Sequence, residues 1–322
     1  MADEYMLTSE QAPVITHAIV YPRVKSRQRY FLHAVLFLGT VLTTLFWGAW
    51  WMLLHKAQGV VPGPYEYFLD ALTHPEHLIQ GFGYSFAIML ILLSHEMGHF
   101  LACKYYGIDA TLPFFLPAPI VSTGTFGAFI RIRAPFPNRK SLFDVGIAGP
   151  LAGFIVALPF IYFGIEWSPL VPKVATEGQI YFGEPLIFKL LSKSPPGLDY
   201  LLHPVGFAAW FACLATSLNL IPIAQLDGGH ISYALFRRRA YHITWIFFAG
   251  LLALAAFGFT RSIMAGMQWI FFSIVLLILK KIAGFRHPPT INDEEPIGTA
   301  RVVWGMIAAI VFILTFIPVT IF

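Results

Sequence analysis

The chain has 322 residues, of which 57% are hydrophobic and 12% are charged, about half the charged share of an ordinary soluble domain. This composition excludes a soluble enzyme with a large core and indicates a multi-pass membrane protein. The net charge of +4 does not require a nucleic-acid partner, because a membrane topology explains where the basic residues lie.

A membrane span needs about 20 apolar residues, and seven segments of the chain are candidates. In chain order they are Phe31–Leu54, Gly81–Tyr106, Val145–Phe163, Pro204–Ile223, Tyr241–Phe257, Ser262–Leu279 and Val302–Ile321. The fourth segment is interrupted by Pro222, and a tight turn separates the fifth from the sixth. The sequence therefore predicts an all-α polytopic membrane protein with about seven transmembrane helices.

The basic residues predict the orientation of these spans. If the path starts inside and alternates, sixteen of the 21 Lys and Arg residues fall on inner segments, as the positive-inside rule expects. The amino terminus is then cytosolic and the carboxyl terminus lies outside. Residues 1–29 form a polar cytosolic tail, and its Asp3, Glu4 and Glu10 argue against a transit peptide. We therefore expect a bacterial plasma membrane protein.

Three connections between spans are long enough to matter, and the first, residues 55–80, is mildly acidic and expected on the outer side. Within residues 107–143, apolar and polar side chains alternate over Gly124–Arg133, which predicts a membrane-associated strand or hairpin after the second helix. Non-helical backbone near lipid must lie against protein or a water cavity, so we expect it beside the polar residues of the spans. In residues 166–203, the apolar run Leu186–Leu191 is either a short surface helix or an irregular loop.

The second predicted span contains the motif His95-Glu96-Met97-Gly98-His99. Histidines four residues apart share one face of a helix, so both imidazoles can reach one zinc ion. Glu96 can then face the attacking water and act as general base. The alternative is a pair of histidines hydrogen-bonded to neighbours. However, three ionisable residues inside a span are costly without a compensating cation.

Asp227 is the candidate for a third zinc ligand, since a catalytic zinc takes three protein ligands. The second and fourth spans run in the same direction under the predicted topology, so both motifs fall in the inner half of the membrane. Ionised Asp227 and Glu96 together balance the charge of Zn²⁺. The alternative is that Asp227 caps a helix after the break at Pro222.

Other residues in the spans have simpler expected roles. Gly149 and Gly153 give a small face on which another helix can pack closely, and this packing could also hold the second and fourth spans in register. We do not expect His230 to be a ligand, although it follows Asp227 closely. Cys103 and Cys213 are expected to be free, buried residues.

Taken together, the two motifs resemble the site-2 protease family of intramembrane zinc metalloproteases. The resemblance rests on His95-Glu96-x-x-His99 and on Asn219-x-x-Pro222-x-x-x-Leu226-Asp227-Gly228, over roughly residues 81–240. It implies that His95, His99 and Asp227 bind one Zn²⁺ ion, that Glu96 is the catalytic base, and that Asn219 assists the substrate or the transition state. The pattern is most similar to the plant-plastid and bacterial branch that lacks a PDZ domain.

The resemblance implies a peptidase domain over residues 30–322, with a catalytic core near residues 81–240. Its substrates would be other membrane proteins, cut within or near their transmembrane segments. The alternative is a non-proteolytic membrane protein, such as a metal transporter or an inactive binding scaffold. A transporter needs ligands on both sides of the membrane midplane, whereas the sequence offers one polar cluster. An inactive scaffold would have lost Glu96 or a ligand, and all are present.

Overall fold

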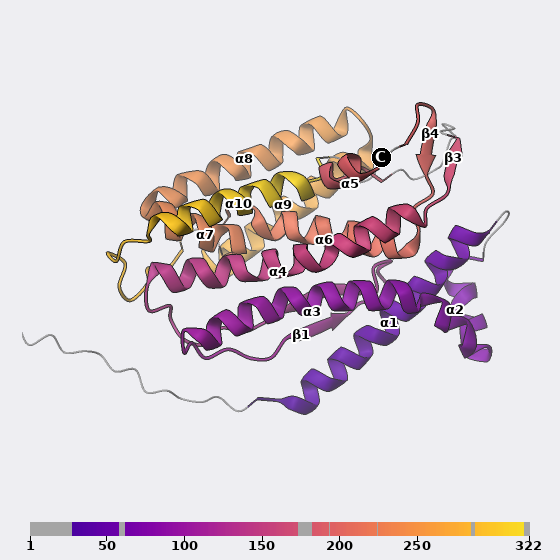
Figure 1. Cartoon of the computed structure of the whole chain (residues 1–322), viewed down its shortest axis with the longest axis horizontal. Coiled ribbons are helices and arrows are strands. Elements are labelled where there is room, and N and C mark those ends of the chain that lie inside the picture. Colours follow the sequence, from indigo (N-terminus) through magenta and orange to yellow (C-terminus); the bar gives the residue numbers. More distant parts are fainter. Residues whose placement is uncertain are drawn as a thin grey trace, which may run out of the picture.

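The protein forms an elongated bundle of helices with two small antiparallel sheets (Figure 1). The computed structural model describes residues 28–57, 62–172, 182–192, 194–223, 225–284 and 287–318. Its helices are α1 (Tyr30–Lys56), α2 (Pro64–Thr73), η1 (Pro75–Gly81), α3 (Phe82–Tyr105), α4 (Arg139–Glu166), α5 (Leu186–Leu191), α6 (Pro204–Leu220), α7 (Asp227–Phe236), η2 (Arg237–Arg239), α8 (Ala240–Phe259), α9 (Ile263–Ala283) and α10 (Thr299–Thr315). Its strands are β1 (Phe114–Pro117), β2 (Thr125–Phe129), β3 (Leu170–Pro172) and β4 (Leu198–Tyr200). Most of the predicted tail, residues 1–27, lies outside the described residues.

Every predicted span coincides with a helix, but the helices differ in length. Four stretches are long and apolar enough to cross a membrane, namely Tyr30–Lys56, Pro75–Tyr105, Arg139–Glu166 and Asp227–Phe259. Three further apolar helices are shorter, namely Pro204–Leu220, Ile263–Ile278 and Thr299–Thr315. The structure therefore confirms a mostly helical chain suited to a bilayer, while the count of seven spans stays a prediction.

Proline chemistry sets the break between α6 and α7. Pro222 lacks a backbone N–H and restricts the residue before it, and Ile221 leaves the helical region with φ −59° and ψ 127°. Helix α6 therefore ends at Leu220, short of the predicted end at Ile223. Asp227 then opens a new helix, α7, and does not continue the fourth span.

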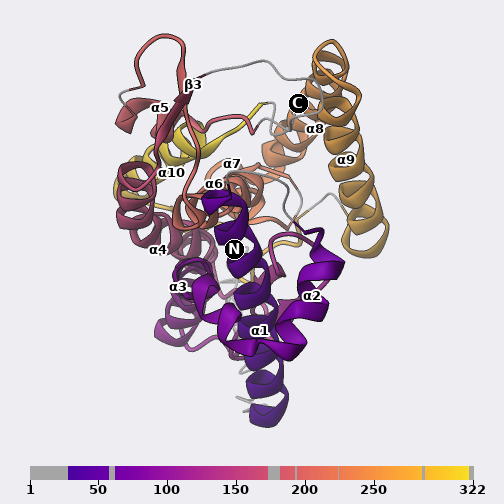
Figure 2. The same ribbon diagram turned by 90° about the vertical axis from the view of Figure 1, so that its right-hand side faces the viewer.

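Helix α4 lies between α3 on one side and α6 on the other (Figure 1), and it also packs against α7. Glycines allow these helices to meet at backbone distance. A Cβ on Gly98 would lie 2.4 Å from the carbonyl oxygen of Ala148, and one on Gly164 would lie 2.2 Å from the Cα of Gly206. The small face predicted on α4 is thus used for close helix packing. In contrast, α8 and α9 pair at the edge of the bundle (Figure 2).

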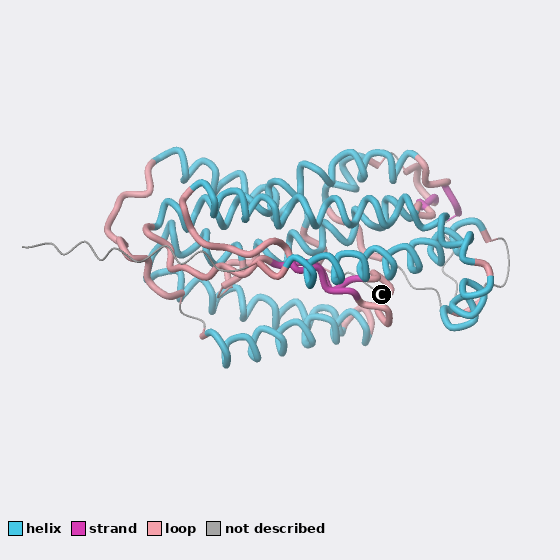
Figure 3. The backbone as a smooth tube through the Cα atoms, turned by 90° about the horizontal axis from the view of Figure 1, so that it is seen from below, coloured by secondary structure: helices cyan, strands magenta, loops and turns pink. Residues whose placement is uncertain are grey.

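The hairpin predicted after the second helix is present. Strand β2 covers part of the predicted Gly124–Arg133 segment and pairs antiparallel with β1, with Phe114 opposite Phe129. The strands run along the long axis of the molecule (Figure 3), and β1 lies against α1. The outer edge of β2 has no strand partner among the described residues.

Side chains from α1 and α3 hold the turn of this hairpin. Trp47 and Trp51 donate their indole N–H groups to the carbonyls of Pro119 and Ser122, at 3.0 and 2.8 Å. Two hydroxyls do the same, from Thr43 to Gly124 and from Tyr84 to Thr123. Irregular backbone at membrane depth is stable only when other protein groups hydrogen-bond its amides and carbonyls. These four bonds do so for carbonyls of the turn.

The connection between α4 and α6 differs in part from the expectation. Residues Leu186–Leu191 form the short helix α5, which settles the choice between helix and irregular loop. The sheet formed by β3 and β4 was not predicted, because each strand has only three residues and no alternating pattern.

Candidate metal centre

Two helices bring three metal-binding side chains to one point inside the bundle. His95 and His99 lie one turn apart on α3, and Asp227 lies in the first turn of α7. The two Nε2 atoms are 3.1 Å apart, and each is 3.3 Å from Oδ2 of Asp227. Asp227 therefore starts a helix, as the capping alternative required, and still reaches both histidines.

The spacing of these atoms fits a tetrahedral zinc ion. Bonds of about 2.0–2.1 Å in a tetrahedron place the ligand atoms about 3.3 Å apart, close to the separations observed here. Within the described residues, these three form the one group of histidines, cysteines and carboxylates close enough to hold a metal ion. Two nitrogens and one oxygen are also a ligand set typical of catalytic zinc.

The charge balance of the site also favours a divalent cation. His95, Glu96 and His99 expose only 7%, 6% and 7% of their surface and the side chain of Asp227 exposes 15%, so two carboxylates lie in a largely dry interior. In the described part of the chain, Asp227 forms ion pairs only with the two histidines. Two buried carboxylates without a cation would be costly, and one divalent ion balances both.

The orientation of His99 is set by helix α4. Its Nδ1–H donates to the carbonyl oxygen of Val145 at 2.7 Å, which leaves the Nε2 lone pair facing the ligand group. The ring also occupies the space above Gly149, where an added Cβ would lie 2.1 Å from Nε2. The sequence predicted close packing at Gly149 but gave no signal that the partner is a metal-binding ring.

Glu96 lies next to the hairpin. The backbone of Ile130, just past β2, lies near its carboxylate. The strand segment therefore lies beside the polar cluster, as expected from the need to satisfy non-helical backbone. Glu96 therefore lies close to the free edge of β2.

Asn219 reaches the site from the last turn of α6. Its Nδ2 lies 3.3 Å from Nε2 of His95. An amide at this position can donate hydrogen bonds into the space shared by the ligand atoms. All five residues singled out in the sequence, from three different helices, thus meet at one place.

His230 lies outside this ligand group. Its Nδ1 is 2.7 Å from Nε2 of His287, a residue that follows α9 and was not singled out from the sequence. The two cysteines are free and buried, as expected. Their positions in α3 and α6 make them packing residues and not part of the centre.

The site and the fold together define a helical membrane protein with a buried metal centre of the metallopeptidase type. Residues 83–260 match the profile of Peptidase family M50, which covers more than half of the chain. The chain belongs to this family, which confirms the resemblance to site-2 proteases.

Plant proteins are among the relatives. A rice protein named "Probable zinc metalloprotease EGY1, chloroplastic" is 26% identical over 308 residues, which cover 90% of this chain and 50% of the relative. The Arabidopsis thaliana protein of the same name is also 26% identical, over 90% of this chain and 53% of its own length. An Arabidopsis thaliana protein named "Probable zinc metalloprotease EGY2, chloroplastic" is 32% identical over 56% of this chain and 33% of its own. The chain spans about half the length of the curated relatives it matches most fully, and no solved structure matches it significantly.

Proposed function

We propose that the protein is a zinc metalloendopeptidase that cleaves peptide bonds within or near transmembrane segments of other membrane proteins. The observation that carries the proposal is the meeting of His95, His99 and Asp227 next to Glu96 inside a bundle of apolar helices. The relatives named zinc metalloproteases and the family match support the same chemistry. The presence of one candidate metal group among the described residues favours a peptidase over a metal transporter, which needs a path of sites.

These side chains have separate roles in hydrolysis. His95, His99 and Asp227 would hold zinc, which when bound polarises the scissile carbonyl and acidifies water. Glu96 takes the proton of the attacking water and passes it to the leaving amine. The amide of Asn219 donates a hydrogen bond to the oxyanion that develops on the carbonyl oxygen.

A transmembrane substrate has to unwind before it can react, because a helix buries its peptide groups in its own hydrogen bonds. The outer edge of β2 offers backbone groups to an extended segment, and Ile130 at the end of that edge contacts Glu96. Pairing at this edge would align the unwound peptide with the catalytic base.

The proposal includes a membrane orientation and a domain layout. The amino terminus lies in the cytosol and the carboxyl terminus lies outside. The relatives described above are named chloroplastic, so they do not support the expected bacterial plasma membrane. The unequal distribution of Lys and Arg supports the orientation. The peptidase domain comprises residues 30–322, with its core near residues 81–240, and follows a cytosolic tail over residues 1–29.

Purified variants with a model transmembrane substrate test this function. Glu96→Gln should keep one zinc ion per chain and lose cleavage, because the base is removed while the ligands stay. Glu76→Gln, an exposed carboxylate in η1, is the matched control and should behave as wild type. Normal cleavage by Glu96→Gln, or wild-type protein purified without chelators and lacking metal, would overturn the proposal.

A further inference from the structure

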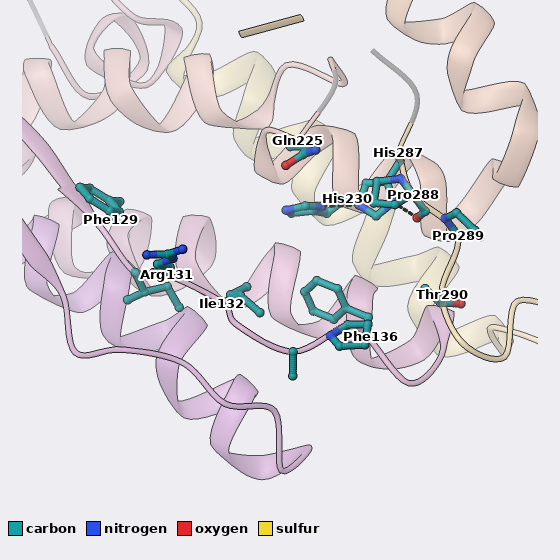
Figure 4. A pocket seen from close by; sticks show the side chains of 13 residues that line it. Phe129, Arg131, Ile132, Phe136, Gln225, His230, His287, Pro288, Pro289 and Thr290 are labelled. Carbon is teal, nitrogen blue, oxygen red and sulfur yellow. Dashed lines mark hydrogen bonds between the residues drawn. The ribbon is translucent and has the colours of Figure 1, made fainter. Parts of the chain in front are cut away.

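A pocket of about 410 Å³ lies beside the metal centre (Figure 4). It is lined by the chain that follows β2, the first turn of α7 with Gln225 just before it, and the segment before α10. The residues that matter for its chemistry are Phe129, Arg131, Phe136, His230, His287 and Thr290. Its volume lies in the range of sites that bind small groups in proteins, about 300–1,000 Å³.

The pocket lies next to the proposed catalytic site along the chain. Ile130 lines the pocket and its backbone also lies near Glu96, while His230 lies one turn after Asp227. The backbone amide and carbonyl of Arg131 both hydrogen-bond to Thr111. Backbone groups alternate in direction along an extended chain, so the amides and carbonyls of Ile130 and Ile132 point toward the free edge. A peptide paired with this edge, with its scissile bond at Glu96, therefore continues into the pocket.

The walls of the pocket are held in place before any ligand arrives. His287 Nδ1–H donates to the carbonyl of Pro288 at 2.6 Å, so its Nε2 accepts the Nδ1–H of His230. The amide of Ile291 donates to the carbonyl of Phe136, which joins two sides of the pocket. A preformed cavity of this kind loses little conformational entropy when it binds a side chain.

Arg131 gives the pocket its charge. It is the one lysine or arginine among the lining residues, the lining includes no carboxylate, and no described carboxylate forms an ion pair with it. In Figure 4 it lies on the wall with Phe129, opposite His230 and His287.

The acidic residues of the segment before α10 already have partners. Asp293 bonds to Tyr233 and Thr290, Glu294 pairs with Arg237, and Glu295 pairs with Lys140. The guanidinium of Arg131 thus remains available for a carboxylate supplied by a ligand.

We propose that this pocket is a substrate subsite for an acidic side chain close to the cleaved bond. The inference rests on the proposed peptidase function and deepens it, because it names a feature of the substrate. Phe129 and Phe136 cover the stem of the Asp or Glu side chain, and Arg131 binds its carboxylate. The subsite fixes the position of the unwound segment along β2 and so selects which bond reaches Glu96.

The test is a charge scan of one model membrane substrate. Asp, Asn and Lys are placed in turn at successive positions on both sides of the cleaved bond, and kcat/KM is measured for each. At one position, wild-type enzyme should prefer Asp over Asn by about tenfold, the ratio expected for one charge-assisted hydrogen bond. Arg131→Gln should remove this preference, and Arg131→Glu should reverse it in favour of Lys. Arg133→Gln, two residues along and outside the lining, should retain the preference.

The outcomes separate this inference from the proposed function. If wild-type enzyme cleaves every substrate equally well at all positions, the subsite is refuted while the peptidase stands. If no substrate is cleaved, the peptidase function itself fails. An Asp preference that survives in Arg131→Gln and Arg131→Glu also refutes the subsite. The wild-type scan needs no variant, so a poorly folding variant does not remove the test.

Discussion

His95 and His99 contact Asp227, and His230, three residues after Asp227, contacts His287, yet the chemistry of the two histidine pairs differs. In the pair His95/His99, two Nε2 atoms face a carboxylate oxygen, and Nδ1–H of His99 is bound to a backbone carbonyl. In the pair His230/His287, an N–H of one ring points at the nitrogen of the other, and no carboxylate lies between them. A metal site needs lone pairs that converge with a compensating charge, and proximity of imidazoles alone does not provide this.

The largest effect expected from this difference is on metal content. Asp227→Ala removes a ligand and a compensating charge, so zinc should fall from one per chain to near zero. Cleavage should then drop about a thousandfold or more, which is the several kcal/mol that a catalytic metal supplies. His230→Ala should keep its zinc. Metal analysis of both purified variants checks the comparison, and equal zinc loss in both would place the second pair in the metal site.

A smaller change can disturb the first pair through its packing. Gly149→Ala puts a methyl group 2.1 Å from His99 Nε2, so the ring has to move and zinc affinity should fall at least about tenfold. Gly250→Ala in α8 is the matched control, since an added Cβ meets nothing within 4 Å. The control should keep its affinity and gain about 0.5–1 kcal/mol of helix stability. Competition with a chelator measures both affinities, and an unchanged value for Gly149→Ala would contradict the packing described here.

The second pair should influence substrate use and leave the metal in place. His287→Phe retains a ring to stack on Tyr233, from which the His287 ring is 4.6 Å away, but removes the acceptor for His230. We expect unchanged zinc content and a fall in kcat/KM of about three- to tenfold, because one hydrogen bond of about 1 kcal/mol no longer fixes the pocket wall. Parallel metal analysis and cleavage assays test this. Loss of zinc in His287→Phe would show that the two pairs are coupled.

A third histidine contact, that of His203 with His55, lies outside the spans and is expected to make stability depend on pH. Burial, together with His55 and Lys56, lowers the pKa of His203 from 6.5 to about 4. Between these values the unfolded chain binds a proton that the folded chain does not, so stability should fall as the pH drops from about 6.5 to about 4. Above pH 6.5 this contribution is constant.

The neutral ring of His203 accepts the amide of Val205 at the start of α6, and protonation removes that cap. His203→Asn keeps a capping acceptor without the titration. Its melting temperature should match wild type at pH 7.5 and exceed it at pH 5. If the melting temperatures of both proteins fall equally between pH 7.5 and pH 5, other groups cause the acid sensitivity.

The sequence predicted the features that depend on local spacing. His95 and His99 share a helix face because they are four residues apart, and apolar runs became helices because their backbone bonds are satisfied internally. The hairpin was predicted from alternation, but its partner strand Phe114–Pro117 was not. Pro113 and Pro119 lie close to its two ends, and four residues are too few to show an alternating pattern. The number of membrane crossings does not follow directly from the number of apolar runs, because three of the helices are short.

The sequence by itself determined which residue types the centre contains and the helix face that two of them share, since spacing and helix geometry are local properties. Only the tertiary structure decided which α4 backbone groups hold the ring of His99 and that His287 meets His230 across 57 residues of chain. These contacts depend on which helix faces pack together, and packing minimises the energy of the whole bundle at once. No window of neighbouring residues contains that information.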